Sequence, residues 1–221
     1  MVEFLVTKGK LVVRNGEPLI VIDGEEKALS KSEFILWTSL NWKILNKESL
    51  EKEFDRRMKK YGIDSEMSFE QTLNRLKSRG LIASKSNYLA ADALYNLLKD
   101  LYVVPLGIVG NFKKAMIFGF MLIDGMPLDK CREAMADFDL KGLEKQIVCF
   151  SKRLKVSGAE LIRISDKGLW DIKSEDDIVP LAYDEHEDTD ILGNYTRFSK
   201  CKAEVLEAIV NLYLKKQIVF E

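Results

Sequence analysis

The stretch Gln71–Ala90, QTLNRLKSRGLIASKSNYLA, decides how the first half of the chain folds. Leu73 and Leu76 share one face of a helix. Gly80 is expected to end that helix, because glycine adopts the left-handed conformation without a Cβ clash. An apolar pair, a polar tip and a second apolar pair follow, and they predict two very short strands around Ser84–Asn87. The stretch therefore predicts a helix followed directly by a small hairpin.

Helical patterns lie on both sides of this stretch. Ser30 with Glu33 three residues later forms a capping box at the start of a first helix. A second helix is expected over 47–62, a third over roughly 66–79 with Phe69 on its inner face, and a fourth from about Asp92. The sequence thus predicts three helices, a hairpin and a further helix.

The chain begins with short β-branched runs at 2–7, 10–14 and 18–22. Asn15-Gly16 and Asp23-Gly24 lie beside these runs and supply the positive φ angles that tight hairpin turns require. This pattern predicts an N-terminal β-meander.

The run Phe69-x-x-x-Leu73-x-x-Leu76-x-x-x-Gly80-Leu81-Ile82 resembles the third helix and first wing strand of a winged helix-turn-helix domain. The meander ahead of the first helix is similar to that of response-regulator effector domains, although the chain has neither a receiver domain nor the usual wing sequence. The resemblance covers residues 1–102 and implies that the third helix binds duplex DNA.

An inward Phe69, Leu73 and Leu76 predict an outer face on this helix, since successive residues turn by about 100°. That face is expected to hold Ser68, Gln71, Thr72 and Arg75, whose side chains can bond to base edges. We expect phosphate contacts from Lys77, Arg79, Arg56, Arg57, Lys59 and Lys60, and wing contacts from Lys85 and Asn87. Against this interpretation, Glu66 and Glu70 would repel phosphates, and the basic residues of 55–60 also fit a solvated helix face.

The second half is predicted to be mostly helical. Helices fit 112–123, 127–137, 140–156 and 198–216, a hairpin fits 159–165 with 168–173, and a strand closes the chain. This order is compatible with a degenerate second winged helix. The predicted fold is therefore α+β, with a winged-helix domain over 1–104 and a second α+β domain over 105–221 that dimerises or senses a signal.

The helix over 198–216 has an apolar stripe formed by Val205, Ile209, Leu212 and Tyr213. Two interpretations stay open: the stripe packs in the core of its own domain, or it forms a homodimer contact, as two-fold readers of palindromic DNA use.

Charge and cysteine content describe an ordinary soluble protein. The net charge is -1, and residues 52–85 hold 9 basic and 5 acidic residues, a surplus of +4. The three cysteines form no Cys-x-x-Cys pair, which favours reduced, packed thiols in the cytoplasm. The longest apolar run, at 115–123, is nine residues, too short for a membrane span.

Catalytic chemistry has little support in the sequence. The single histidine, His186, lies in DEHEDTD, and this acidic loop fits neither a calcium nor a zinc pattern. Asp137 and Asp139 are a second, weaker pair of metal-ligand candidates. Because no phosphate loop, nucleophile elbow or zinc-protease motif is present, we expect no enzyme activity, no cofactor and no metal.

The leading hypothesis is a cytoplasmic, DNA-binding transcriptional regulator of winged-helix type. Near-zero net charge and the acidic segment 175–190 motivate an alternative, a tandem winged-helix adaptor that binds proteins. A plasmid-type replication initiator with two winged helices ranks last, because such proteins are usually more basic.

Overall fold

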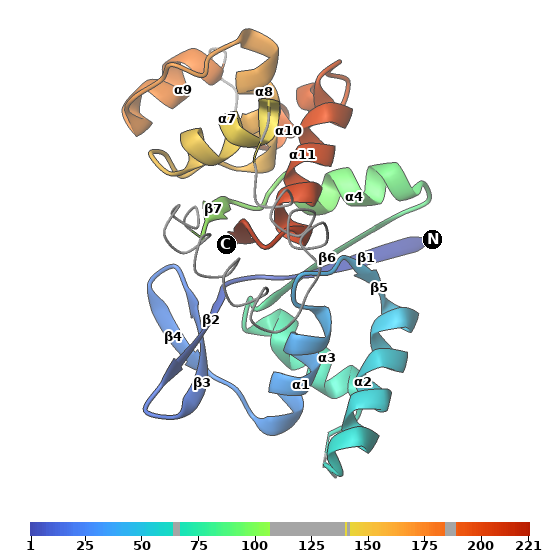
Figure 1. Cartoon of the computed structure of the whole chain (residues 1–221). Coiled ribbons are helices and arrows are strands. Elements are labelled where there is room, and N and C mark those ends of the chain that lie inside the picture. The colour runs from blue at the N-terminus through green and yellow to red at the C-terminus, as the bar shows by residue number, and fades with distance from the viewer. Residues whose placement is uncertain (64–66, 107–139, 141, 184–188) are drawn as a thin grey trace, which may run out of the picture.

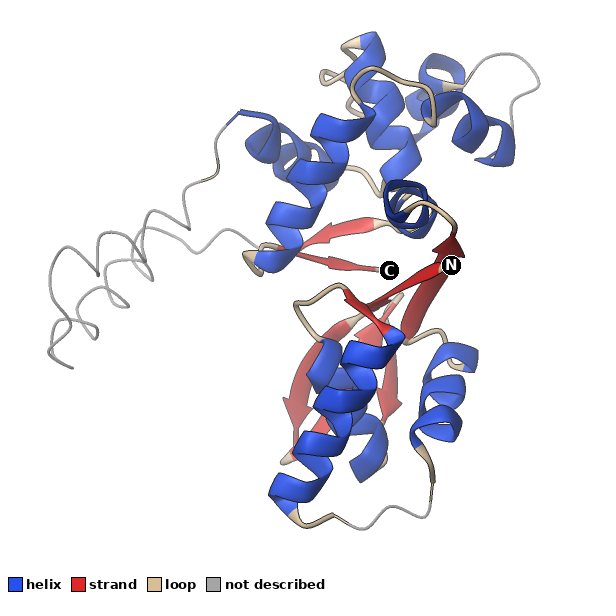
Figure 2. Cartoon of the chain, turned by 90° about the vertical axis from the view of Figure 1, so that its right-hand side faces the viewer, coloured by secondary structure: helices blue, strands red, loops and turns tan. Residues whose placement is uncertain are grey.

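The computed structural model describes residues 1–63, 67–106, 140, 142–183 and 189–221 (Figure 1). It has the expected α+β composition, with helices and small antiparallel sheets. Two helical lobes lie on opposite sides of a group of strands (Figure 2). Among the described residues, no helix is both long and apolar enough to cross a bilayer.

A β-meander is present near the N-terminus, and it contains two of the three predicted strands, those at 10–14 and 18–22. β2 (Lys10–Arg14), β3 (Glu17–Ile22) and β4 (Glu25–Ala28) pair antiparallel in that order. Their turns have the positive φ angles that Asn15-Gly16 and Asp23-Gly24 predict. The strand at 2–7 is confirmed, but it belongs to another sheet, and the meander gains β4 instead.

The lobe at the bottom of Figure 1, called the lower lobe below, contains the three helices that the sequence predicts. They are α1 (Lys31–Leu40), α2 (Lys47–Tyr61) and α3 (Phe69–Ser78). Ser30 and Ser68 each form a capping box, with Glu33 and Gln71 respectively. Gly80 has φ +71° as expected, and the Leu81 N–H donates to the Leu76 carbonyl at 2.9 Å to close the helix end.

The predicted wing hairpin is wrong. Residues 82–87 form a single strand, β6 (Ile82–Asn87), which pairs along its whole length with β1 (Val2–Thr7). β1 also pairs with the short strand β5 (Leu45–Asn46), so the sheet order is β5-β1-β6. The backbone of β6 therefore pairs with β1 in place of the predicted second wing strand, and no turn forms at Ser84–Asn87.

β1 separates two hydrophobic cores. Leu5 is fully buried in the core of α1, α2 and α3, whereas Val6 is fully buried in the core on the other side of the sheet and Phe4 packs against that same core. Successive side chains of a strand point to opposite faces, so one strand contributes to both cores. α4 (Ala90–Leu98) covers the face opposite α1 and α3 (Figure 1).

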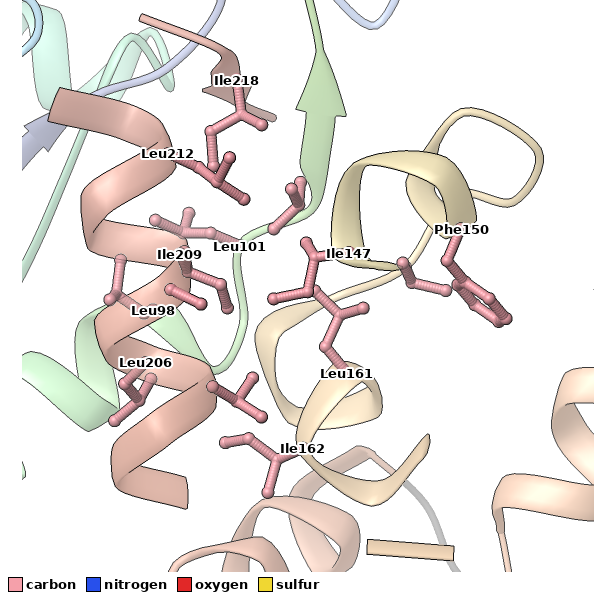
Figure 3. Packing of buried hydrophobic residues seen from close by; sticks show 14 of the residues in the cluster. Leu98, Leu101, Ile147, Phe150, Leu161, Ile162, Leu206, Ile209, Leu212 and Ile218 are labelled. Atoms are coloured by element: carbon pink, nitrogen blue, oxygen red, sulfur yellow. The ribbon is translucent and has the colours of Figure 1, made fainter. Parts of the chain in front are cut away.

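The second core joins α4 to the C-terminal elements (Figure 3). The elements that contribute to it are α7 (Gly142–Ser151), α8 (Gly158–Lys167), α9 (Ile178–Ala182), α11 (Lys202–Leu214), β7 (Val103–Pro105) and β8 (Ile218–Phe220). The described C-terminal half also contains the short 3-10 helix η1 (Glu175–Asp177) and α10 (Thr189–Thr196). β7 pairs antiparallel with β8. Val6 of β1 belongs to this core and Ala83 of β6 packs against it, so the β5-β1-β6 sheet is shared by both cores.

The hairpin expected at 159–165 and 168–173 is wrong, because the first of these segments is helical in α8. Ser157 and Glu160 form a capping box at its start, and Gly168 ends it at φ +67°. Because this hairpin does not form, the second half lacks the order of elements that suggested a degenerate second winged helix. The helices expected at 112–123 and 127–137 lie outside the described residues.

The helix predicted over 198–216 is confirmed as α11, and its apolar stripe packs inside the molecule. Val205, Ile209, Leu212 and Tyr213 are all buried in the second core. The core interpretation of these four residues is therefore confirmed, and a homodimer contact through other residues of the helix over 198–216 stays a prediction. Of the two described cysteines, Cys149 is exposed rather than packed.

Candidate nucleic-acid interface

The outer face of α3 is open to solvent. Glu70, Gln71, Asn74, Arg75 and Ser78 are exposed along it, while Phe69, Leu73 and Leu76 face the core of the lower lobe. The exposed set combines amide, hydroxyl and guanidinium groups, which are the groups that bond to base edges in a major groove. Of the predicted base-contacting residues, Ser68, Gln71 and Arg75 are exposed together here.

Thr72 is not part of this face. Its side chain is fully buried, and its hydroxyl donates to the Ser68 carbonyl at 3.0 Å. Its predicted contact with DNA is wrong. Thr72 follows Phe69 by three residues and precedes Leu76 by four, so helical geometry places it on the inner side.

Ser68 and Gln71 have a structural role as well. The Gln71 N–H donates to Ser68 Oγ at 3.3 Å, and the Ser68 N–H donates to Gln71 Oε1 at 2.9 Å. These bonds satisfy two of the free amides at the start of α3. The amide nitrogen of Gln71 keeps its two donors for another partner.

Arg75 and Arg79 converge on a buried carboxylate of α1. Glu33 is 1% exposed, and its Oε1 lies 3.1 Å from Arg75 Nε and 2.8 Å from Arg79 Nη1. Burial alone would raise the pKa of Glu33, but hydrogen bonds from Ser30 and Arg79 outweigh it and leave the pKa below its usual value. This cluster fixes α3 to α1, and it occupies one side of each guanidinium.

Two further ion pairs flank α3. Lys77 Nζ lies 2.8 Å from Glu3 Oε1 on β1, and Lys47 Nζ lies 2.5 Å from Glu70 Oε1. The second pair neutralises Glu70, whose charge would otherwise repel phosphates. The first pair removes Lys77 from the expected set of free phosphate contacts.

The basic residues of α2 divide into two groups. Arg56 and Arg57 both bind Glu53, at 2.9 Å and 2.8 Å from Nε. The hydrogen bond from Arg56, with that from Arg57, lowers the pKa of Glu53 to about 2 despite desolvation. Lys59 and Lys60 are exposed, and neither has a carboxylate partner among the described residues.

Lys85 and Asn87 lie on a strand rather than at a wing tip. Lys85 is paired in register with Phe4, and its Nζ is 3.8 Å from Asp100, directly after α4. Asn87 accepts from the neighbouring Tyr88 N–H at 2.6 Å. Because alternate residues of β6 face opposite sides, Lys85 lies on the α4 side of the sheet, away from α3. Their predicted role as wing contacts is wrong.

Asn74 and Ser78 are exposed on the α3 face but are not in the predicted set of DNA contacts. Both follow from the spacing, since Glu70, Asn74 and Ser78 are four residues apart. The predicted set wrongly includes the buried Thr72 in this exposed face.

Comparison of the chain with protein-family models, with curated proteins and with solved structures finds no match. Within the described ranges, no group of three His, Cys, Asp or Glu side chains is arranged to hold a metal ion. Asp137, Asp139 and the acidic residues 184–188, including His186, lie outside those ranges.

Proposed function

We propose that this protein is a DNA-binding regulator that acts in the cytoplasm and contacts duplex DNA through the outer face of α3. The observation that supports the proposal is the exposed row of Gln71, Asn74, Arg75 and Ser78 on a helix fixed at both ends. The capping box holds one end, and the turn at Gly80 holds the other. A rigid helix with polar groups on one face is suited to enter a major groove.

Electrostatics limit the affinity that this surface can provide. Six of the eight cations expected to contact DNA are within ion-pair distance of a carboxylate, namely Arg56, Arg57, Arg75, Lys77, Arg79 and Lys85. Lys59 and Lys60 remain for phosphates among the described residues. We therefore expect binding with a small salt slope, of about two to four released counterions.

Selection of bound fragments from a genomic library, followed by fluorescence-anisotropy titration at two salt concentrations, tests the proposal. We expect affinity that falls as salt rises, because phosphate contacts release counterions. Arg75→Ala should cost about 1–3 kcal/mol on a selected site. Absence of duplex binding at low salt would defeat the proposal.

A protein-binding adaptor is the second candidate, and one observation favours it. Tyr88, Leu89, Tyr195 and Phe198 are exposed, with Tyr88 and Phe198 at 85%. Arg197 Nη2 lies 2.7 Å from Asp92 Oδ2, which brings the 195–198 segment to the start of α4, directly after Tyr88 and Leu89. Exposed apolar groups that gather in one place are typical of protein-binding surfaces.

Affinity purification with the whole chain separates the two candidates. A stoichiometric protein partner that survives nuclease treatment and is lost on Phe198→Ser would favour the adaptor. Retention of duplex DNA by both the wild type and Phe198→Ser would favour the regulator.

A further inference from the structure

A cavity lies between α1 and the end of α2, and no residue of α3 lines it. Its volume is about 410 Å³, within the range of small-molecule sites. Lys31, Phe34, Ile35 and Thr38 of α1 line it, together with Arg57, Tyr61 and Ile63 from α2 and the residues that follow. We call it the α1/α2 cavity.

The apolar wall of the cavity contains two aromatic side chains, Phe34 and Tyr61, that belong to neither hydrophobic core. Phe34 is partly buried and belongs to neither hydrophobic cluster, although it lies between Glu33 and Ile35, which are both buried. Tyr61 is 60% exposed at the end of α2. A phenyl ring beside an open cavity loses the contacts that a packed core would provide, and a bound apolar group would restore them.

The polar part of the lining is positive. Arg57 and Lys31 border the cavity, and no carboxylate is among the described lining residues. Arg57 is held in place, because its Nε lies 2.8 Å from Glu53 Oε1 and its Nη1 is 3.5 Å from Thr38 Oγ1. Within the described part of the chain its Nη2 has no partner, and neither does Lys31 Nζ.

The one carboxylate beside Arg57 does not cancel the positive charge of the cavity rim. Glu53 is the shared partner of Lys43, Arg56 and Arg57, so three cations face one carboxylate. A pre-oriented guanidinium with free N–H groups binds a carboxylate or a similar oxyanion well. The cavity therefore combines an apolar wall with a cationic rim.

We propose that the α1/α2 cavity binds a small amphipathic anion, with its apolar body against Phe34 and Tyr61 and its oxyanion at Arg57 and Lys31. This site is separate from the α3 face and does not depend on DNA binding. The charge of the rim selects an anion over a neutral or cationic molecule of the same shape.

Two-dimensional NMR of the full chain, titrated with decanoate, decanol and decylamine, tests the proposal. We expect decanoate to bind most tightly and to shift the amide signals of residues 31–38 and 57–63. Arg57→Met keeps the volume of the side chain and removes its charge, so it should weaken decanoate binding about tenfold or more and leave decanol unchanged. Thr38→Leu, which fills the cavity, should weaken both.

Lys173→Met is the matched control, because Lys173 borders a different surface cavity of similar volume. Lys31→Met is a second variant of the rim, and we expect it to fold like the wild type, because the Lys31 side chain is exposed. Equal affinity for decanoate and decanol would overturn the proposal. Shifts that map outside the α1/α2 cavity, or binding that neither rim variant changes, would overturn it as well.

Discussion

Glu33 is the residue on which the attachment of α3 to α1 depends. The buried carboxylate accepts from the Ser30 N–H at 2.8 Å and binds both Arg75 and Arg79. Glu33→Gln removes the charge and leaves two guanidinium groups without their partner, so we expect a loss of about 1–3 kcal/mol in the free energy of unfolding. Urea denaturation measures it. Glu25→Gln, at a largely exposed side chain, should change stability by less than about 0.5 kcal/mol.

The same residue predicts a pH dependence. The pKa of Glu33 is lowered from 4.5 in the folded chain, so its stabilising contribution is present above pH 4.5 and is lost as the pH falls through the folded value. The difference in unfolding free energy between wild type and Glu33→Gln should therefore shrink below pH 4.5. A constant difference down to strongly acid pH would contradict this assignment.

Thr72 shows what residue-scale sequence reasoning can and cannot provide. The inner positions of α3, its capping box and its end at Gly80 all follow from local spacing. The same spacing places Thr72 on the inner side, although its hydroxyl is typical of an outer, base-contacting position. The ion pairs of Arg75 and Lys77 could not be predicted from local sequence, because their partners Glu33 and Glu3 are distant in sequence.

At the scale of elements, local sequence patterns predict the helices of the lower lobe correctly. They do not predict strands whose pairing partners are distant in sequence. Nothing within Ile82–Asn87 distinguishes half a hairpin from a strand whose partner is the N-terminus. The segment at 159–165 was mistaken because its apolar residues suit a strand, although Ser157 and Glu160 supply a capping box.

The junction of α4 and α8 gives a prediction at this scale. The first amides of α8 bond to carbonyls of the residues that directly follow α4: the Gly158 N–H donates to the Leu101 carbonyl at 3.1 Å and the Ala159 N–H to the Lys99 carbonyl at 2.9 Å. A Cβ at Gly158 would collide with the Leu98 carbonyl oxygen, which is rigid backbone. Gly158→Ala should therefore cost about 1–3 kcal/mol by urea denaturation.

Gly193→Ala is the matched control for this junction. A Cβ there would lie 2.8 Å from Lys99 Nζ, the end of a flexible side chain that can move away. We expect little loss of stability, since alanine also favours the helix. Equal losses in the two variants would show that the close approach at Gly158 has no special importance.

At the scale of the whole molecule, β1 and Tyr213 join the two lobes. The Tyr213 hydroxyl lies 2.6 Å from Thr7 Oγ1 on β1 and accepts from the Trp42 N–H at 3.2 Å. Tyr213→Phe removes both bonds and leaves the Trp42 N–H without this acceptor, so we expect a loss of about 1–3 kcal/mol in the free energy of unfolding. Tyr195→Phe, at an exposed ring, should change stability by less than about 0.5 kcal/mol.

Alkaline unfolding tests the same contact. Burial raises the pKa of Tyr213 to about 12, from 10.0 in the unfolded chain. Its contribution is complete below pH 10 and is lost as the pH rises through 12, because the unfolded chain loses its proton first. Wild type should lose stability over this window more steeply than Tyr213→Phe, and parallel curves would contradict the assignment.

Photo-crosslinking tests the central claim, that the outer face of α3 contacts duplex DNA, most directly. Asn74 is exposed on that face without a described partner, and Asn194 is an exposed asparagine on α10 in the other lobe. With a photo-reactive side chain placed at one position or the other, we predict crosslinks to a selected duplex at 74 and none at 194. DNA that binds and crosslinks at 194 but not at 74, or equally at both, would contradict the claim.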